Sequence, residues 1–213
     1  MVSPDDTSDP RPQARFTRRD FLRGVGAAIA GTAAFDSGLP LEPAHSEAAE
    51  NAAATGAARV NIVLDVNGQL RAVEVEPQAS LADILRGPLN LPGTKIGCGR
   101  GACSACTVWL DRTPILSCMV LAIDVGERKV VTIEGLARGP ELHPVQSAFI
   151  AHDAIQCGFC TPGLVMSCAA LVESNRNPSD EDVKTAISGH LCRCGTYPHV
   201  VEAVLDAAKS MKA

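Results

Sequence analysis

Residues 93–107 read GTKIGCGRGACSACT, and this glycine-rich segment with three cysteines is the most informative part of the sequence for the fold. Its three cysteines are spaced C-x4-C-x2-C, and the residues between them are small except for Arg100, which we expect to face solvent. Glycines let a backbone approach a bound group closely, whereas bulky side chains between the cysteines would push it away. A fourth cysteine, Cys118, follows in the sequence. The pattern predicts a tight loop that wraps a group held by thiolates.

These four cysteines have the spacing of plant-type ferredoxins, which bind a [2Fe-2S] cluster. We therefore predict that one cluster is held by Cys98, Cys103, Cys106 and Cys118. A zinc loop or disulfide bonds are the alternatives for the same residues. Because zinc sites usually combine two C-x2-C pairs, iron-sulfur binding is the favoured interpretation of this loop.

A second group of cysteines lies in the last third of the chain. Cys157 and Cys160 form a C-x2-C pair, and Cys192 and Cys194 form a C-x-C pair. Each pair falls at a junction between predicted helices, so four thiolates from two turns can meet at one point. Taken alone, these residues suit zinc and an iron-sulfur cluster about equally, and a redox dithiol could use them too. In an exported protein they could also form disulfides.

The sequence around the first loop predicts a small mixed sheet. Strands are expected at 59–66, 69–76, 107–111, 115–118 and 129–133. The pair Asn67-Gly68 suits a tight hairpin turn between the first two strands, and 111–113 a turn between the third and fourth. Ser80 is expected to cap a short helix that continues through Leu85 and crosses the sheet.

The hydrophobic period changes from two to nearly four after a predicted linker at 135–142. Four helices are expected beyond it, at 144–152, 162–174, 179–188 and 198–211. Pro144, Pro162 and Pro198 each suit a first helical position, where a missing N–H costs nothing. The fold class is therefore α+β, a sheet domain followed by an all-α domain.

The first third of the chain is interpreted as a targeting segment. Residues 17–23, TRRDFLR, resemble a twin-arginine motif, and the apolar run 24–35 behind it is rich in Gly and Ala. This run is shorter than the roughly 20 residues that span a bilayer, so we expect export to the periplasm without stable membrane insertion. Cleavage is expected between about residues 44 and 54, where small residues recur.

The composition excludes some classes of partner. A net charge of −5 and a pI near 5.5 remove the usual electrostatic reason for binding nucleic acid or an anionic membrane surface. Because 46% of residues are hydrophobic but only 3% are aromatic, the core must be built mainly from Ala, Val, Leu and Ile.

Four blocks of sequence resemble the small iron-sulfur subunit of the xanthine oxidase and aldehyde oxidoreductase family. They are GTKIGCG at 93–99, GACSACTV at 101–108, QCGFCTPG at 156–163 and HLCRCGTY at 190–197. The resemblance extends over 59–208 and favours iron-sulfur binding for the second cysteine group as well. Ser104 departs from the common pattern, because the family often has Gly there, and so does Arg100, where an acidic or polar residue is frequent.

The resemblance implies a β-grasp [2Fe-2S] ferredoxin domain at 59–134 and a four-helix [2Fe-2S]-binding domain at 143–213, after a leader at 1–58. It implies eight ligands for two [2Fe-2S] clusters: Cys98, Cys103, Cys106, Cys118, Cys157, Cys160, Cys192 and Cys194. Gln156 matches a position close to the pterin of the partner subunit. The leader resembles the exported branch, which includes periplasmic aldehyde oxidoreductases and isoquinoline-type oxidoreductases.

The function implied by the resemblance is electron transfer without bond making in this chain. A large molybdopterin-binding subunit would oxidise an aldehyde or an N-heterocycle. Electrons would then pass through the helical-domain cluster and the ferredoxin-domain cluster to an FAD-binding subunit or a c-type cytochrome. The alternatives are a free-standing exported carrier with two [2Fe-2S] clusters, and an exported binding module stabilised by zinc or disulfides.

Several other residues have plainer interpretations. Cys168 is expected to be a buried thiol that packs like a small apolar residue. His190 and His199 flank the C-x-C pair but are expected to be structural or exposed, because eight cysteines are already available as ligands. We expect Lys95 to be a solvated loop residue and Trp109 to pack in the core.

Overall fold

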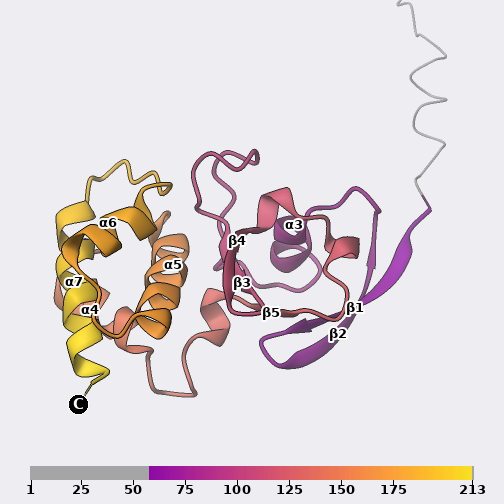
Figure 1. Ribbon diagram of the computed structural model, residues 1–213. Coiled ribbons are helices and arrows are strands. Elements are labelled where there is room, and N and C mark those ends of the chain that lie inside the picture. Colours follow the sequence, from indigo (N-terminus) through magenta and orange to yellow (C-terminus); the bar gives the residue numbers. More distant parts are fainter. Residues whose placement is uncertain (1–57, 213) are drawn as a thin grey trace, which may run out of the picture. The chain divides into compact units, whose positions relative to one another are not determined.

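The computed structural model describes residues 58–212, which begin with a five-stranded mixed sheet (Figure 1). The strands are β1 Val60–Val66, β2 Gln69–Val75, β3 Thr107–Leu110, β4 Thr113–Leu116 and β5 Lys129–Val131. Their order in the sheet is β2-β1-β5-β3-β4. Only β1 and β5 pair in parallel; the other neighbours are antiparallel. The sheet therefore brings the hairpin β3-β4, which follows the cysteine loop, to one edge.

The predicted hairpin and the predicted short helix are both confirmed. Asn67 and Gly68, which connect β1 to β2, have positive φ angles of 55° and 76°, as a tight two-residue turn requires. Helix α3, Leu81–Arg86, begins at the cap Ser80, whose Oγ accepts a hydrogen bond from the backbone N–H of Asp83 at 3.2 Å. The helix buries its apolar face, including Leu85, in the core of the sheet domain.

The predicted position of the fourth strand is wrong by two residues. The turn consists of Asp111 and Arg112 alone, both with positive φ, so β4 already starts at Thr113. The strand ends at Leu116, although the backbone N–H and Oγ of Ser117 still donate to the carbonyl of Cys106 in the same register, at 3.3 and 2.7 Å. Cys118 consequently lies in a 3-10 turn, η1 Ser117–Met119, and not in a strand.

The four helices of the last third are confirmed within about two residues. They are α4 Pro144–Ala151, α5 Thr161–Ser174, α6 Asp180–Ile187 and α7 Tyr197–Ser210. Pro144 occupies the first helical position as predicted, whereas Pro162 and Pro198 occupy the second, where the N–H also lacks an intrahelical acceptor. None of the helices in residues 58–212 combines the length and apolarity needed to cross a membrane.

Residues 135–142, the predicted linker, contain local structure of their own. The 3-10 turn η3, Ile133–Gly135, leads into this segment. Arg138 and Glu141 then form a small antiparallel bridge, with backbone hydrogen bonds of 2.9 and 3.1 Å between them. The described residues 58–212 lie in one compact unit, so the sheet and the helices pack directly against each other.

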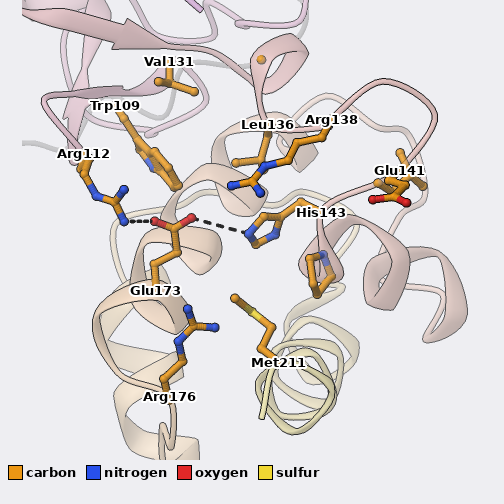
Figure 2. Close-up of a pocket in the computed structure, with 13 residues that line it drawn as sticks. Trp109, Arg112, Val131, Leu136, Arg138, Glu141, His143, Glu173, Arg176 and Met211 are labelled. Carbon is orange, nitrogen blue, oxygen red and sulfur yellow. Dashed lines mark hydrogen bonds and ion pairs between the residues drawn. The ribbon is translucent and has the colours of Figure 1, made fainter. Parts of the chain in front are cut away.

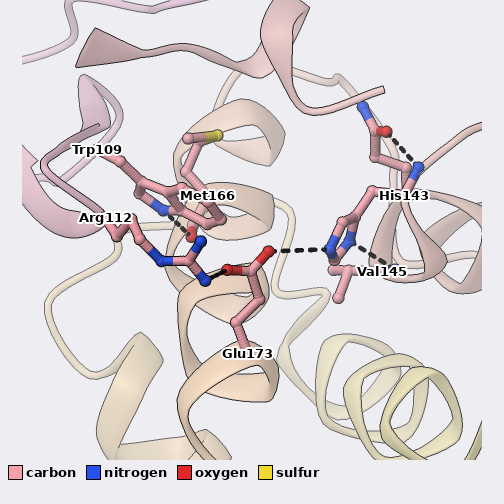
Figure 3. A network of polar contacts seen from close by, with 7 residues as sticks. Trp109, Arg112, His143, Val145, Met166 and Glu173 are labelled. Carbon is pink, nitrogen blue, oxygen red and sulfur yellow. Dashed lines mark hydrogen bonds and ion pairs between the residues drawn. The ribbon is translucent and has the colours of Figure 1, made fainter. Parts of the chain in front are cut away.

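Trp109 joins the sheet to the helices. It belongs to β3, yet its side chain is 5% exposed and lies in the same apolar cluster as Phe149, Leu164 and Val172 of the helices. Its indole Nε1 donates to the backbone carbonyl of Met166 in α5 at 2.8 Å (Figure 3). The prediction that Trp109 packs in the core is confirmed, and the core is that of the helices.

Replacement of Trp109 is expected to destabilise the protein far more than breaking the neighbouring surface ion pair. Trp109→Ala should lower the free energy of unfolding by about 3–5 kcal/mol, because it removes a large buried side chain. Arg112→Ala breaks the 2.5 Å pair with Glu173 but should cost at most about 1 kcal/mol, because the Arg112 side chain is largely exposed. Urea unfolding of the cluster-loaded variants measures both values, and equal losses would contradict this packing role.

Candidate metal centres

The first cysteine loop turns backbone N–H groups toward a sulfur. Gly99 and Gly101 have positive φ angles of 62° and 75°. In this conformation the N–H groups of Arg100 and Ala102 donate to Sγ of Cys98 at 3.5 and 3.2 Å. Donors of this kind stabilise a thiolate and tune a metal bound to it. The side chain of Arg100 is exposed, as predicted.

The four cysteines of this loop lie as two neighbouring pairs. Cys98 is hydrogen-bonded to the thiol of Cys103, and Cys106 to the thiol of Cys118. Hydrogen bonds from the Arg100 backbone and from the Cys103 thiol lower the pKa of Cys98 to about 7, whereas burial raises the pKa of Cys106 to about 11. Metal ligation requires thiolates, so binding must displace the proton of the buried Cys106.

The second group of cysteines is assembled from two turns that precede helices. Cys157 and Cys160 come just before α5, and Cys192 and Cys194 just before α7. Burial is the main cause that raises the pKa of Cys160 to about 12, and the neighbouring thiols of Cys192 and Cys157 act in the same direction. Cys160 and Cys192, from the two different turns, are therefore neighbours. No hydrogen bond within residues 58–212 joins Cys194 to another cysteine.

Two residues that the sequence analysis did not single out hold the turn of Cys192. Burial acts to raise the pKa of Cys192, but hydrogen bonds from the side chain and backbone of Thr196 outweigh it and leave the pKa at about 7. Thr196 Oγ1 lies 3.4 Å from the Cys192 sulfur. The hydroxyl of Tyr197 accepts from the Cys192 N–H at 2.7 Å and donates to the carbonyl of His190 at 2.8 Å.

The arrangement of the first four thiols in two pairs fits a two-iron cluster, which takes two thiolates on each iron. In the part of the chain that the structure describes, no three or more His, Cys, Asp or Glu side chains converge as ligands of a single metal ion. The N–H donors at Cys98 and the hydroxyl at Cys192 supply the hydrogen bonds that cluster sulfurs require. All nine cysteines are free thiols, so both groups remain available as ligands.

The two cysteine loops contact each other directly. The backbone N–H of Leu191 donates to the carbonyl of Cys103 at 3.2 Å, and Leu191 precedes Cys192 in the chain. A second bond runs from Ser104 Oγ to the carbonyl of Gly189 at 2.9 Å. One hydrogen bond thus connects a predicted ligand of the first group to the peptide that carries a predicted ligand of the second.

Gln156 is exposed on the surface beside Cys157. Large apolar side chains next to the second group of cysteines in the sequence are exposed as well: Ile155, Phe159 and Leu191 are 39%, 48% and 62% exposed. Exposed apolar side chains of this kind suit contact with a partner. The predicted contact of Gln156 with a pterin in that partner stays a prediction.

The plainer interpretations of the remaining residues hold. Cys168 is fully buried in α5, and burial alone raises the pKa of its thiol. His190 is 4% exposed, and its Nε2 lies 2.8 Å from Ser167 Oγ, so it is structural. His199 is exposed and bonds through Nδ1 to the carbonyl of His152. Lys95 is a partly exposed loop residue whose Nζ donates to the carbonyl of Pro92 at 2.6 Å in an exposed position.

A pocket of about 560 Å³ lies where the β3-β4 turn, the 135–142 segment and α5 meet (Figure 2). No cysteine lines it. Glu173 accepts from Arg112 and lies 3.8 Å from Nε2 of His143, which caps α4 (Figure 3). Burial lowers the pKa of His143 and outweighs the opposite effect of Glu173, so its imidazole is neutral at pH 7. The pocket forms part of the junction between the sheet and the helices.

Two family models together match most of the described chain. Residues 64–129 match the 2Fe-2S iron-sulfur cluster binding domain, and residues 132–205 match the [2Fe-2S] binding domain. These matches coincide with the sheet and its cysteine loop in the first case and with the four helices in the second. The predicted α+β fold, a β-grasp ferredoxin domain followed by a helical [2Fe-2S]-binding domain, is confirmed.

Similar proteins match nearly their full length. The nicotine 6-hydroxylase small subunit of Paenarthrobacter nicotinovorans is 48% identical over 149 residues, 70% of this chain and 90% of that protein. The aldehyde oxidoreductase iron-sulfur-binding subunit PaoA of Escherichia coli K12 is 38% identical over 214 residues, 92% of this chain and 90% of that protein. The match to PaoA is the longer one.

The solved structure of quinoline 2-oxidoreductase from Pseudomonas putida 86 contains a chain with the same fold. Its TM-score is 0.70 at 38% identity, and the match covers 72% of this chain and 96% of that chain. The likeness therefore concerns a whole subunit. Together with the two domain matches, it shows that the chain belongs to the family of [2Fe-2S] small subunits of molybdenum hydroxylases of the xanthine oxidase and aldehyde oxidoreductase type.

Proposed function

We propose that this chain is a non-catalytic subunit that relays electrons from a molybdopterin-binding partner to a separate acceptor. The observation that carries the proposal is the hydrogen bond from the Leu191 N–H to the Cys103 carbonyl. It makes a continuous path of covalent bonds and one hydrogen bond between the two groups of cysteines. A protein whose two sites acted independently would have no need of such a path.

The residues of this chain hold and tune the two sites. A [2Fe-2S] cluster supplies uptake and release of one electron at a time when bound. The eight cysteines named above would bind two such clusters, and the N–H groups of Arg100 and Ala102 would set the electron affinity of the first site. Thr196 and Tyr197 would do the same at the second site.

The exposed surface around Cys157 supports entry of electrons at the second cysteine group. Gln156 and Phe159, close to Cys157 in the sequence, and Leu191, which precedes Cys192, are exposed, which suits docking of a large partner. Electrons would enter at this surface. They would leave from the first cysteine loop, residues 98–106, which is the ferredoxin loop, to an FAD-binding subunit or a c-type cytochrome. The substrate of the complex would be an aldehyde or an N-heterocycle.

Export by the twin-arginine route is part of the same proposal. Arg18 and Arg19 and the apolar run 24–35 lie outside the described residues. The physical support is that iron-sulfur clusters are assembled in the reducing cytoplasm, so a protein that holds them has to cross the membrane already folded. The mature protein would then work in the periplasm.

The ligand assignment predicts selective loss of iron. Cys98→Ser should remove the iron of the ferredoxin site and leave that of the helical site, and Cys194→Ser should do the reverse, because each cluster needs four thiolates. Cys168→Ala is the matched control and should keep all the iron, since this thiol is buried in α5 away from both loops. Iron analysis and visible absorption check these outcomes, and iron loss in the control would overturn the assignment.

The relay is tested by isolating the native complex. The chain should copurify with molybdenum and a pterin-containing subunit, and a reducing substrate of that complex should bleach the visible absorption of both sites. Recovery of the chain alone, without molybdenum or pterin, would instead support the alternative function of a free-standing two-cluster carrier.

Export is tested by a double substitution in the leader. Arg18→Lys with Arg19→Lys should leave the chain in the cytoplasm, because twin-arginine signals are recognised through this pair. Arg23→Lys preserves the pair and is the matched control. Cell fractionation with immunoblotting gives the answer, and unchanged periplasmic recovery of the double variant would exclude this route.

A further inference from the structure

Gly163, in the first turn of α5, touches the backbone of the ferredoxin loop. A Cβ atom at this position would lie 2.4 Å from the carbonyl oxygen of Ser104, and 3.1 and 3.2 Å from the carbonyl oxygen and carbon of Ala105. Ordinary contacts begin at 3.4 Å. An added methyl group therefore requires the helix and the loop to separate by about 1 Å, the difference between 3.4 and 2.4 Å.

The ferredoxin loop cannot easily retreat from such a methyl group. The carbonyl of Ser104 already accepts hydrogen bonds from the N–H of Thr107 at 3.2 Å and from its Oγ1 at 2.7 Å. Ser104 itself has a positive φ of 56°, which leaves a non-glycine residue little freedom. This peptide lies between Cys103 and Cys106, so moving it would displace predicted ligands.

Helix α5 is held at two further points along its length. The carbonyl of Met166 accepts the indole N–H of Trp109, and Glu173 pairs with Arg112 (Figure 3). Gly163 thus lies against the cysteine loop near the start of the helix, and the other two contacts fix the middle and the end of the helix against the hairpin β3-β4. Gly163 is the contact nearest to the two cysteine loops.

Glycine at this position is unfavourable for the helix alone. It costs about 1 kcal/mol relative to alanine inside a helix, so alanine would be preferred if helix formation were the only requirement. The close approach to Ser104 explains why a residue without a side chain stands here. The close approach of Gly163 to Ser104 preserves the nearby hydrogen bond from the Leu191 N–H to the Cys103 carbonyl.

We infer that Gly163 is a positioning residue that sets the gap between the two cysteine loops and thereby the rate of electron transfer between them. The inference rests on the proposed relay function and adds to it the residue that keeps the path closed. A side chain at 163 widens the gap by moving the start of α5, with the second group of cysteines, away from the first loop as one body, so the thiols keep their arrangement within each group. The transfer rate then falls, but the spectrum of each site does not change.

The test compares Gly163→Ala with the wild-type full chain, both isolated with their clusters and their companion subunits. Reduced [2Fe-2S] clusters carry electron spins, and the splitting caused by two neighbouring spins weakens with the cube of their separation. The variant should show full iron content, unchanged absorption, a smaller splitting and a several-fold slower transfer between the sites. Hydrogen exchange at the peptide containing Leu191 should also become faster, because its bond to Cys103 is weakened.

Gly189→Ala is the matched control. It adds a methyl group at the same junction, but this Cβ would meet only the side-chain oxygen of Ser104, at 3.2 Å, so a shift of a few tenths of an ångström that keeps the Ser104 bond to the Gly189 carbonyl accommodates it. The control should keep the wild-type spin splitting, the wild-type rate of electron transfer between the sites and the wild-type hydrogen exchange at the Leu191 peptide.

Each outcome decides the inference. Wild-type spin splitting and wild-type hydrogen exchange in Gly163→Ala would overturn the inference. A Gly163→Ala variant that fails to fold or loses either cluster would also overturn it, because Gly163 would then be needed for folding and not for the spacing of the loops. The proposed function fails separately, if the wild-type protein itself shows two clusters that exchange no electrons.

Discussion

The hydrogen bond between Leu191 and Cys103 is the interaction on which the rest of this structure depends. It joins the backbone N–H of Leu191 to the backbone carbonyl of Cys103 at 3.2 Å, so it involves no side chain. It forms only if the ferredoxin loop and the turn before α7 approach at backbone distance. The bond of Ser104 to Gly189 and the glycine at 163 serve that approach at the same junction. Two domains with separate cores thereby become one unit.

The sheet and the helices contribute to this junction in different ways. The β3-β4 hairpin supplies Trp109, whose indole enters the helical core, and its turn supplies Arg112 for the pair with Glu173. Helix α5 carries the acceptors of both contacts and also follows directly after Cys160. The same helix therefore positions a predicted ligand and fixes the interface. The buried cysteines 106 and 160 have raised pKa values, so their thiols are protonated until a metal binds.

The sequence predicts the elements well, because local signals decide them. Asn67-Gly68, the cap at Ser80 and the prolines before the helices mark turns and ends within one or two residues. The fourth strand was misplaced because Asp111 and Arg112 adopt positive φ, which residue type does not announce. The cysteine spacing indicates the two sites. The roles of Tyr197, Leu191 and Gly163 depend on contacts between distant segments, which no local pattern specifies.

Two iron-sulfur sites in one chain have to lie close together to exchange electrons. Electron paramagnetic resonance of the full-length protein, reduced stepwise after isolation with its companion subunits, measures this closeness. We expect two distinct spin signals that broaden or split each other once both sites are reduced. A single signal, or two signals that do not affect each other when fully reduced, would contradict this expectation.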